Sequence, residues 1–527
     1  MHDAETIVLL FGLVAVLVVV AHKLALPYPI VLVVAGLGIS FIPHLPDVTL
    51  KPDIVFYFFL PALIYPAAFQ TSWRDFRDNL RSILLLAIGL VLATMVVIAW
   101  VAHSLVPAMP WAAAFALGAI VSPTDAVAAT AVIRRMSAPH RVEVVVEGES
   151  LVNDATALVA LQFAVLALTS GHFSLGAATG QFFFVAAGGI AFGLLVGVAI
   201  RWIHQQLDDP PVQITISLLS PFIEYLGAER LHVSGVLAVV AGGIFIGWHT
   251  PFIVTARYRL QAFAFWDMIV FLLNGFVFII IGLQLPGILR ELHGEPLVRL
   301  MRDAVLVSVA SIVVRLIWVF PGTYLPRLFS KRIRHREGLA DWRNVVVVGW
   351  AGMRGVISLA AAFALPFTLA DGRRFPTRNY ILFFTFAVIF STLVLQGLTL
   401  PWVIRIFCVR DDGGVDDEER SARVEANRAA LKFIEERTRD GKISRSVIER
   451  LRAEYEDRLE QLRVDAETPA DRRGEVATPQ YQRLQHAALK KERETIIRLR
   501  NERVINDQAL RRIQRDLDLA EARLDPA

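Results

Sequence analysis

Polar residues interrupt a long apolar stretch between residues 143 and 169. Ser150, Asn153 and Asp154 occur together in this stretch, and the residues that follow Asp154 are mostly apolar. On a helix, Ser150 and Asp154 project from one face because they are four residues apart. Counted from Glu147 at about 1.5 Å per residue, Asp154 lies about two helical turns inside a membrane-spanning helix.

A carboxylate at this depth loses the water that stabilises its charge. An ionisable group in the middle of a span costs at least about 2.5–3.5 kcal/mol on insertion scales, so such groups are usually functional or paired. Asp154 can lower this cost by holding a proton or a hard cation, which prefers oxygen ligands. We therefore predict an intramembrane site at which Asp154 can exchange its proton for a hard cation. A purely structural aspartate is the alternative.

The segment Ser122-Pro123-Thr124-Asp125 interrupts a second apolar stretch. Proline removes a backbone donor and disfavours helix in the residue before it. This predicts a helix that is broken in mid-membrane and exposes carbonyl and amide groups at its two half-ends, as in many transporter ion sites. A simple proline kink, with Asp125 as a helix cap, is the alternative.

Two arginines, Arg315 and Arg354, also lie within apolar stretches and could supply countercharge. The glycines around Arg354 predict a second interrupted helix, in the opposite half of the chain from Pro123. Paired broken helices in the two halves indicate an inverted repeat with a site at the midplane. Glu224 and Glu229, in contrast, fall near the end of another span and are interpreted as interfacial residues.

The composition is that of a membrane protein. The 527 residues are 55% hydrophobic and 19% charged, whereas soluble domains carry about 25% charged residues. No nucleotide-binding P-loop, zinc-protease helix or nucleophile elbow occurs at a usable place, and a single cysteine, Cys408, excludes an intrachain disulfide. ATP-driven transport and hydrolysis lack the residues that they need, so we expect no enzyme activity, no cofactor and no nucleic-acid partner.

Apolar stretches of about 20 residues can cross the hydrocarbon core as helices. Thirteen stretches meet this criterion, which predicts an all-α polytopic membrane protein. They lie near residues 4–22, 27–43, 53–70, 80–106, 110–133, 143–169, 174–203, 211–228, 232–249, 262–288, 303–326, 343–369 and 379–407. With the N-terminus outside, the inner loops carry 16 lysine and arginine residues and the outer loops 8, which favours this orientation in a bacterial inner membrane.

The C-terminal region is strongly charged. Residues 410–527 are predicted to form a helical cytoplasmic tail that follows a transmembrane domain at residues 1–409. Two apolar stripes with helical spacing occur in it, one at residues 510–520 and one at Ile448, Leu451, Tyr455, Leu459 and Leu462. A helical hairpin that packs on itself or on a partner subunit explains both stripes, and a ligand-sensing role is the alternative.

Several motifs resemble those of the monovalent cation–proton antiporters of the sodium/proton exchanger branch. The matching segments are SPTDAVA at 122–128, GESLVND at 148–154, VSGVLA at 233–238, NG at 274–275, IGLQL at 281–285 and GMRGVISL at 352–359. The resemblance covers roughly residues 5–405, and the tail resembles that of bacterial members.

The resemblance implies thirteen transmembrane helices, a dimerisation domain that makes a homodimer, and a moving core domain in which two broken helices cross. It implies that Asp154 binds a monovalent cation and a proton in turn, among Asn153, Ser150, Thr124 and Asp125. It also implies that Glu149 pairs with Arg315, and that Arg354 offsets the charge of the helix ends at the crossover.

The predicted function is antiport of Na⁺, K⁺ or Li⁺ against H⁺ across the lipid bilayer, in intracellular pH and cation homeostasis. We expect one cation per proton, because residues 153 and 154 are Asn-Asp and supply a single carboxylate. A cation channel and a membrane-embedded ion or pH sensor are the alternatives. Pro66 departs from the family pattern, since many relatives carry an acidic residue there, and this leaves the ion preference open.

Overall fold

The structure is a computed structural model that describes residues 2–24, 26–41, 52–170, 175–290, 292, 295–329, 341–369, 374–409, 414–438 and 445–467, with scattered residues between 491 and 519. The chain divides into two compact units, Met1–Asp412 and Gly413–Ala527. Helices make up the regular structure of the described residues, apart from an isolated β-bridge between Thr368 and Arg374. The predicted all-α fold is confirmed for this part of the chain.

The first half of the larger unit contains helices of very different length. They are α1 (His2–Leu24), α2 (Tyr28–Ile39), α3 (Pro52–Ile54), α4 (Leu60–Gln70), α5 (Trp73–Leu84), α6 (Val91–Leu105), α7 (Trp111–Val121), α8 (Ala126–Arg135), α9 (His140–Ser170) and α10 (Leu175–Gln205). Two π-helical turns, η1 (Val55–Phe59) and η2 (Leu85–Leu90), join α3 to α4 and α5 to α6.

The second half of this unit also contains helices of very different length. Its helices are α11 (Pro210–Arg230), α12 (Gly235–Ile253), α13 (Ala256–Leu283), α14 (Leu285–Arg290), α15 (Leu297–Phe329), α17 (Trp342–Trp350), α18 (Val356–Phe363), α19 (Arg378–Ser391) and α20 (Gly397–Ile406). A π-helical turn, η3 (Thr392–Gln396), joins α19 to α20. Ser234 and Thr255 cap α12 and α13, because each side chain accepts a backbone N–H from the first helical turn.

Eight helical segments in the described part of the chain are long and apolar enough to cross a membrane. They are Trp73–Leu105, Trp111–Arg135, His140–Thr169, Ala178–Gln205, Gly235–Ile253, Arg257–Arg290, Leu297–Leu325 and Arg378–Ile406. Shorter apolar helices cover Leu9–Leu24, Tyr28–Ile39 and Val55–Gln70. Large apolar side chains remain exposed on α10, among them Phe184 and Leu195, as expected for a surface that faces lipid. The predicted polytopic membrane protein is confirmed.

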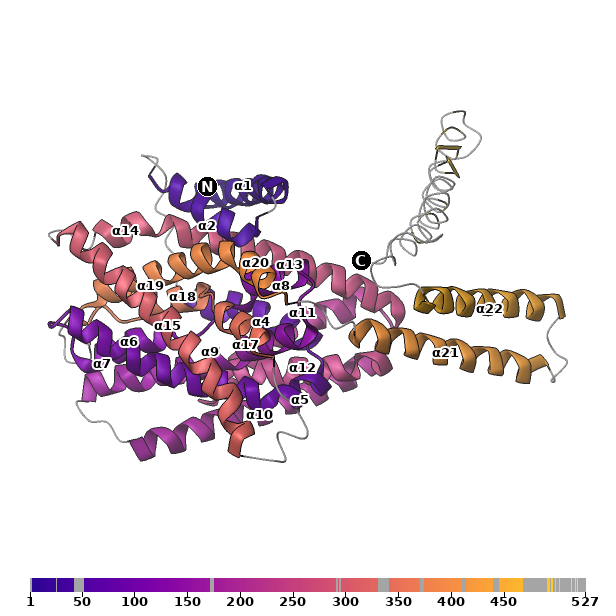
Figure 1. The fold of residues 1–527 in the computed structure, drawn as a ribbon, viewed down its shortest axis with the longest axis horizontal. Coiled ribbons are helices and arrows are strands. Elements are labelled where there is room, and N and C mark those ends of the chain that lie inside the picture. Colours follow the sequence, from indigo (N-terminus) through magenta and orange to yellow (C-terminus); the bar gives the residue numbers. More distant parts are fainter. Residues whose placement is uncertain are drawn as a thin grey trace. The chain divides into compact units, whose positions relative to one another are not determined.

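The helices of this unit pack around two hydrophobic clusters. The larger cluster includes Ile98 of α6, Leu117 of α7 and Phe384 of α19. The long helix α15 packs against both α6 and α19 (Figure 1). The second cluster joins α4, α11, α12 and α13. Leu158 of α9 and Ile357 of α18 contact both clusters, so α9 and α18 lie where the two meet.

In the smaller unit, α21 (Gly414–Thr438) and α22 (Arg445–Glu467) pack side by side as a helical hairpin (Figure 1). The first predicted apolar stripe, from Ile448 to Leu462, belongs to α22. The second stripe, at residues 510–520, lies mostly outside the described residues. Within the described residues the helix that α22 packs against is therefore α21, which precedes it in the chain.

Two glycines let α2 and α13 approach each other closely. A methyl group at Gly36 would collide with the backbone carbonyl of Ile279, and one at Gly282 would collide with the carbonyl of Val33. Gly38, two residues further along α2, is exposed and would place its methyl group in open space. Small residues at such crossings allow the close backbone contact on which helix association in membranes depends.

We expect Gly36→Ala to destabilise the protein and Gly38→Ala to leave it as stable or more so. A methyl group forced against backbone costs about 1–3 kcal/mol, whereas alanine is favoured over glycine by about 1 kcal/mol in a helix. Thermal unfolding of the purified protein in detergent compares the two variants. Equal stability of both would show that α2 and α13 do not make this contact.

Candidate functional site

Both predicted interruptions are present, and the two non-helical segments contact each other. Residues 122–125 separate α7 from α8, and residues 351–355 separate α17 from α18. The backbone N–H of Asp125 donates to the carbonyl of Met353 at 2.8 Å. A side chain at Gly355 would collide with the Asp125 carboxylate, so glycine is needed for this close crossing. The two broken helices therefore cross at their breaks.

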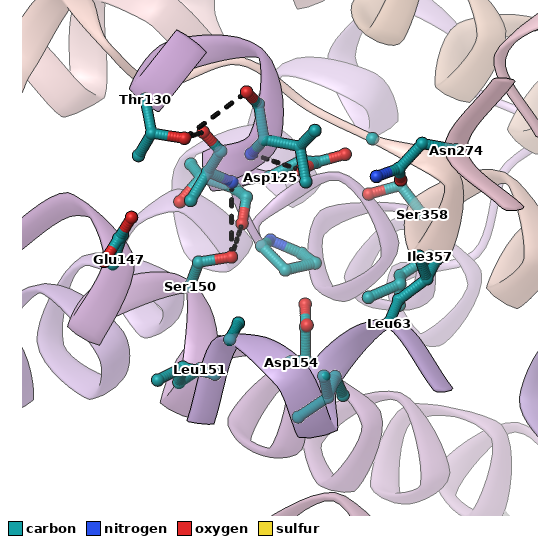
Figure 2. Close-up of a pocket in the computed structure, with 17 residues that line it drawn as sticks. Leu63, Asp125, Thr130, Glu147, Ser150, Leu151, Asp154, Asn274, Ile357 and Ser358 are labelled. Carbon is teal, nitrogen blue, oxygen red and sulfur yellow. Dashed lines mark hydrogen bonds between the residues drawn. The ribbon is translucent and has the colours of Figure 1, made fainter. Parts of the chain in front are cut away.

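Side chains satisfy the backbone groups that the first break releases. The Asp125 carboxylate accepts the N–H of Val127 at 2.9 Å and caps α8. The Ser150 hydroxyl, on α9, donates to the carbonyl of Thr124 at 3.0 Å and accepts the N–H of Ala126 at 3.3 Å (Figure 2). Backbone groups in a membrane need partners within the protein, and α9 supplies several of them here.

Arg354 fills the space between the two breaks. Its Nε donates to the carbonyl of Val121 at 2.8 Å, at the end of α7, and its Nη1 donates to the carbonyl of Gly352, just after α17. Its Nη2 donates to the Ser311 hydroxyl at 3.0 Å. The C-terminal end of a helix carries partial negative charge, so this buried guanidinium stabilises both helix ends.

Glu149 and Arg315 form a buried ion pair behind the first break. Arg315 Nη1 and Nη2 donate to Glu149 Oε1 and Oε2 at 2.5 and 2.8 Å, and the two residues are 0% and 1% exposed. Two-point pairing of this kind is among the stronger hydrogen-bonded ion pairs. Arg315 also donates to the carbonyls of Val348 and Gly349 at the end of α17, so the pair joins α9, α15 and α17.

A chain of hydrogen bonds continues from this ion pair to Asn153. The Thr124 hydroxyl donates to Glu149 Oε1 at 3.0 Å. Asn153 Nδ2 donates in turn to Thr124 Oγ1 at 2.9 Å. Asn153, Thr124, Glu149 and Arg315 thus form one network that connects α9 to the break between α7 and α8.

Asp154 lies beside this network and points into a cavity of about 140 Å³ (Figure 2). Asp154 is 4% exposed. The polar side chains that line the cavity come from the first break and from α8, α9, α13 and α18: Thr124, Asp125, Thr130, Glu147, Ser150, Asp154, Asn274 and Ser358. A water molecule needs about 10–15 Å³ of such space, so the cavity can hold a monovalent cation with water molecules.

The charges around the cavity favour a cation. Asp125 and Asp154 both face it, and none of its lining residues is basic. Along α9 the cavity extends from Asp154 to Glu147, which is partly exposed and pairs with Arg134 at 2.8 Å. The cavity is therefore more accessible at its Glu147 end than at Asp154.

A second hollow, of about 360 Å³, lies on the other side of Asp154 along α9. Gln162 and Thr169 of α9 and Leu365 after α18 line it. Buried apolar residues of α9, including Ala157 and Leu161, lie between Asp154 and Thr169. Asp154 thus stands between two hollows and is open to the one that contains Glu147.

Most of the predicted site residues meet at this cavity. Asp154, Asp125, Ser150 and Thr124 line it, whereas Asn153 does not. The Asn153 amide instead faces Thr124, and its Oδ1 has no hydrogen-bond partner among the described residues. Glu149, Arg315 and Arg354 lie behind the cavity and hold its walls.

Our prediction of the site did not include four polar residues that line the cavity: Thr130, Glu147, Asn274 and Ser358. Asn274 could have been found by the reasoning that singled out Asp154, because it is also a polar residue in the middle of an apolar stretch. Ser358 follows the second break by three residues, but only the packing of α18 shows that it reaches the cavity.

The wall contributed by α4 is apolar. Leu63, Ile64 and Ala67 line the cavity there, and Pro66 is buried within α4. The departure at Pro66 therefore leaves no carboxylate on this helix, and the charged ligands available to an ion come from the first break and α9.

The interpretation of Glu224 as an interfacial residue is wrong. Glu224 is 0% exposed on the inner face of α11, whereas Glu229 is exposed. The position of a residue along a helix predicts its depth, but only the neighbouring helices decide whether its side chain faces lipid, water or protein.

Comparison with known proteins gives a consistent result. Residues 7–406 match the family model described as sodium/hydrogen exchanger, transmembrane. An uncharacterized Na⁺/H⁺ exchanger of Mycobacterium tuberculosis is 36% identical over 98% of this chain and 97% of its own. A sodium, potassium, lithium and rubidium/H⁺ antiporter of Bacillus subtilis is 32% identical over 85% of this chain and 67% of its own.

Among solved structures, the fold resembles the sodium proton antiporter MjNhaP1 from Methanocaldococcus jannaschii. The TM-score is 0.60, with 19% identity over 76% of this chain and 98% of that one. At this identity the likeness concerns the fold alone.

We expect Glu149→Ala to lower the stability and yield of the protein strongly. Removal of one partner leaves Arg315 charged and buried, which costs about 3–5 kcal/mol. Glu143→Ala is the matched control on the same helix, since its pair with the exposed Arg134 is worth about 0–1 kcal/mol. Thermal unfolding in detergent compares them. An inactive Glu149→Ala protein as stable as the control would contradict the structural role of the pair.

Proposed function

The chain belongs to the sodium/hydrogen exchanger family, and from this premise we propose that Asp154 is the residue at which it exchanges a monovalent cation for a proton. The protein is a multi-pass membrane antiporter of cations and protons. Membership of this family does not support the alternatives of a cation channel or a membrane-embedded sensor.

The cavity at Asp154 carries the proposal. Oxygen atoms of Asp154, Asp125 and Thr130 line it, and hard monovalent cations prefer such ligands. When the cation leaves, a bare carboxylate at this depth is costly, so a proton takes its place. A cation and a proton thus compete for one carboxylate, and this competition is sufficient for exchange.

The residues around Asp154 have positioning roles in this proposal. Asp125 caps α8 and adds negative charge to the cavity. Asn153 and Ser150 hold the first break against α9 through Thr124 and Ala126. The break and α9 would therefore move as one body when the protein changes conformation.

The ion pair and Arg354 extend this body to the second break. Glu149 and Arg315 tie α9 to α15 and α17. Arg354 offsets the helix ends of α7 and α17. Without these contacts a shift of α9 would separate Asp154 from the crossing helices.

Alternating access follows from the two hollows. In this conformation Asp154 is open toward Glu147 and separated from the hollow at Gln162 by apolar residues of α9. A displacement of α9 and the broken helices relative to α4 would close the first hollow and open the second. If this displacement occurs only when Asp154 carries a cation or a proton, the cation flux is coupled to the proton flux.

The finer topology is part of the proposal. Helices α1, α2, α3–α4, α5–α6, α7–α8, α9, α10, α11, α12, α13, α15, α17–α18 and α19–α20 would make thirteen spans. Each broken helix is followed by a long one, α9 or α19–α20, which supports an inverted repeat. We propose a homodimer in the bacterial inner membrane, with the N-terminus outside and the tail in the cytoplasm.

The name of a relative and the groups that line the cavity together suggest which ion is transported. The Bacillus subtilis relative is named for sodium, potassium, lithium and rubidium, so we propose Na⁺, K⁺ or Li⁺ as the cation. The apolar wall of α4 leaves the ion to carboxylate, hydroxyl and amide groups on the other side of the cavity. This exchange would serve pH and cation homeostasis in the cell.

Asp154→Asn is expected to abolish exchange without unfolding the protein, because an amide cannot take up a proton in exchange for a cation. A pH dye in proteoliposomes reports proton movement on addition of NaCl, KCl or LiCl. Asp267→Asn, at an exposed position of α13, is the control that should keep the activity. Exchange by Asp154→Asn above the level of empty liposomes would exclude Asp154 as the carrier.

Exchange is expected to be electroneutral, since one carboxylate binds one cation or one proton. In proteoliposomes with a clamped membrane potential, the ion gradient at which net flux vanishes should be the same at every voltage. A reversal point that moves with voltage would show that cations and protons are not exchanged one for one.

A further inference from the structure

Helix α11 carries a stripe of polar side chains on its buried face. Gln213, Ser217, Ser220 and Glu224 follow helical spacing and are between 0% and 3% exposed. The opposite face is apolar and exposed, for example at Ile223, which is 53% exposed. The helix is therefore polar toward the protein and apolar toward the lipid.

Three members of this stripe have hydrogen bonds. Gln213 Nε2 donates to the carbonyl of Leu207 at 2.6 Å, and the Ser217 hydroxyl accepts Trp266 Nε1 at 3.0 Å. The Ser220 hydroxyl donates to the carbonyl of Ile216 at 2.7 Å, within its own helix. These contacts explain how the serines and the amide are accommodated away from water.

Glu224 differs from the other members of the stripe. Both of its carboxylate oxygens are buried and have no hydrogen-bond partner among the described residues. The carboxyl group lies directly against Gly242 of α12, where any side chain would collide with it. The Glu224 carboxyl group thus packs against the surface of α12 at Gly242, and this surface supplies no hydrogen-bond donor.

The groups that face this region from the neighbouring helices are mostly uncharged. Tyr65 of α4 approaches Ser217, Ser220 and Glu224. Tyr258 of α13 lies near Tyr65, and His204 of α10 contacts Tyr258. Tyr57 of η1 and Glu229 of α11 are the other titratable groups on the packed elements, and both lie near Tyr225. Across the described helices around it, no lysine or arginine pairs with Glu224.

Glu224 is 0% exposed, so a charge there would be shielded from bulk water, and no described residue supplies a cation or a donor to stabilise it. Such burial costs several kcal/mol per ion. A carboxylic acid has no net charge and avoids most of this cost. Gly242 packs directly against the Glu224 carboxyl group and occupies the space that a bound metal ion would need.

We propose that Glu224 is a second proton-binding site, separate from Asp154, which holds its proton while α4, α11 and α12 remain packed. Asp154 takes part in exchange, whereas Glu224 lies outside the cavity that contains Asp154. Loss of the Glu224 proton would place an unpaired charge between three helices and separate them.

This site is linked to the ion cavity through α4. Tyr65 faces α11, while Leu63, Ile64 and Ala67 of the same helix line the cavity. Displacement of α4 when Glu224 ionises would therefore move one wall of the cavity. The exchanger would lose activity at alkaline pH for a reason that does not involve Asp154.

Infrared spectroscopy tests the proton directly and does not depend on exchange. We compare purified Asp154→Asn with Asp154→Asn/Glu224→Gln at neutral pH, in buffers without and with NaCl. The single variant should show the carbonyl stretch of one additional carboxylic acid, in both buffers. Identical spectra would mean that Glu224 is ionised and would overturn the proposal. Loss of the band on addition of NaCl would identify a cation site and would also overturn it.

The pH profile of exchange tests the link to the cavity. Glu224→Gln mimics the protonated acid, so we expect normal exchange at neutral pH and an alkaline limb that moves to higher pH. Glu229→Gln, at an exposed position on the same helix, is the matched control and should follow the wild-type profile. An alkaline limb of Glu224→Gln that coincides with that of Glu229→Gln would overturn the link.

Discussion

Backbone groups that are released where a helix breaks inside a membrane have no water to bind, and this constraint accounts for most of the contacts around the cavity. The breaks at residues 122–125 and 351–355 satisfy each other through the bond from Asp125 to Met353. Ser150 and Arg354 supply donors and acceptors for the remaining ends. Unsatisfied groups in hydrocarbon cost several kcal/mol each, so these side chains are required for the broken helices to be stable within the membrane.

The same constraint gives Asp154 a different role from the polar residues around it. Asn153, Thr124, Glu149 and Arg315 are engaged with one another and with helix ends. The Asp154 carboxylate faces open space instead (Figure 2). A rigid network thus surrounds one carboxylate that is free to change its partner, which is the arrangement that cation–proton competition needs.

Helix α11, which does not take part in the crossing breaks, must be compatible with lipid although it carries polar residues. Helix α11 directs its polar residues inward and its apolar residues outward, which keeps it compatible with lipid although it is not among the segments that qualify as spans by apolar composition alone. Burial of Glu224 against Gly242 follows from this arrangement. A proton there would make the packing of α4, and therefore one wall of the cavity, depend on pH.

Local chemistry in the sequence determined the helical membrane fold and the two breaks, and it singled out Asp154 as a carboxylate within a span. Apolar length predicts spans, a proline in mid-span predicts a break, and a carboxylate at that depth predicts a site, because each depends on the chain's own neighbours and on the bilayer. The tertiary structure alone decided which polar groups meet. Asn153 turns toward Thr124, Asn274 and Ser358 reach the cavity, and Glu224 is enclosed by α12. These outcomes depend on which distant helices lie side by side, and hydrophobic periodicity within one helix carries no information about its partner.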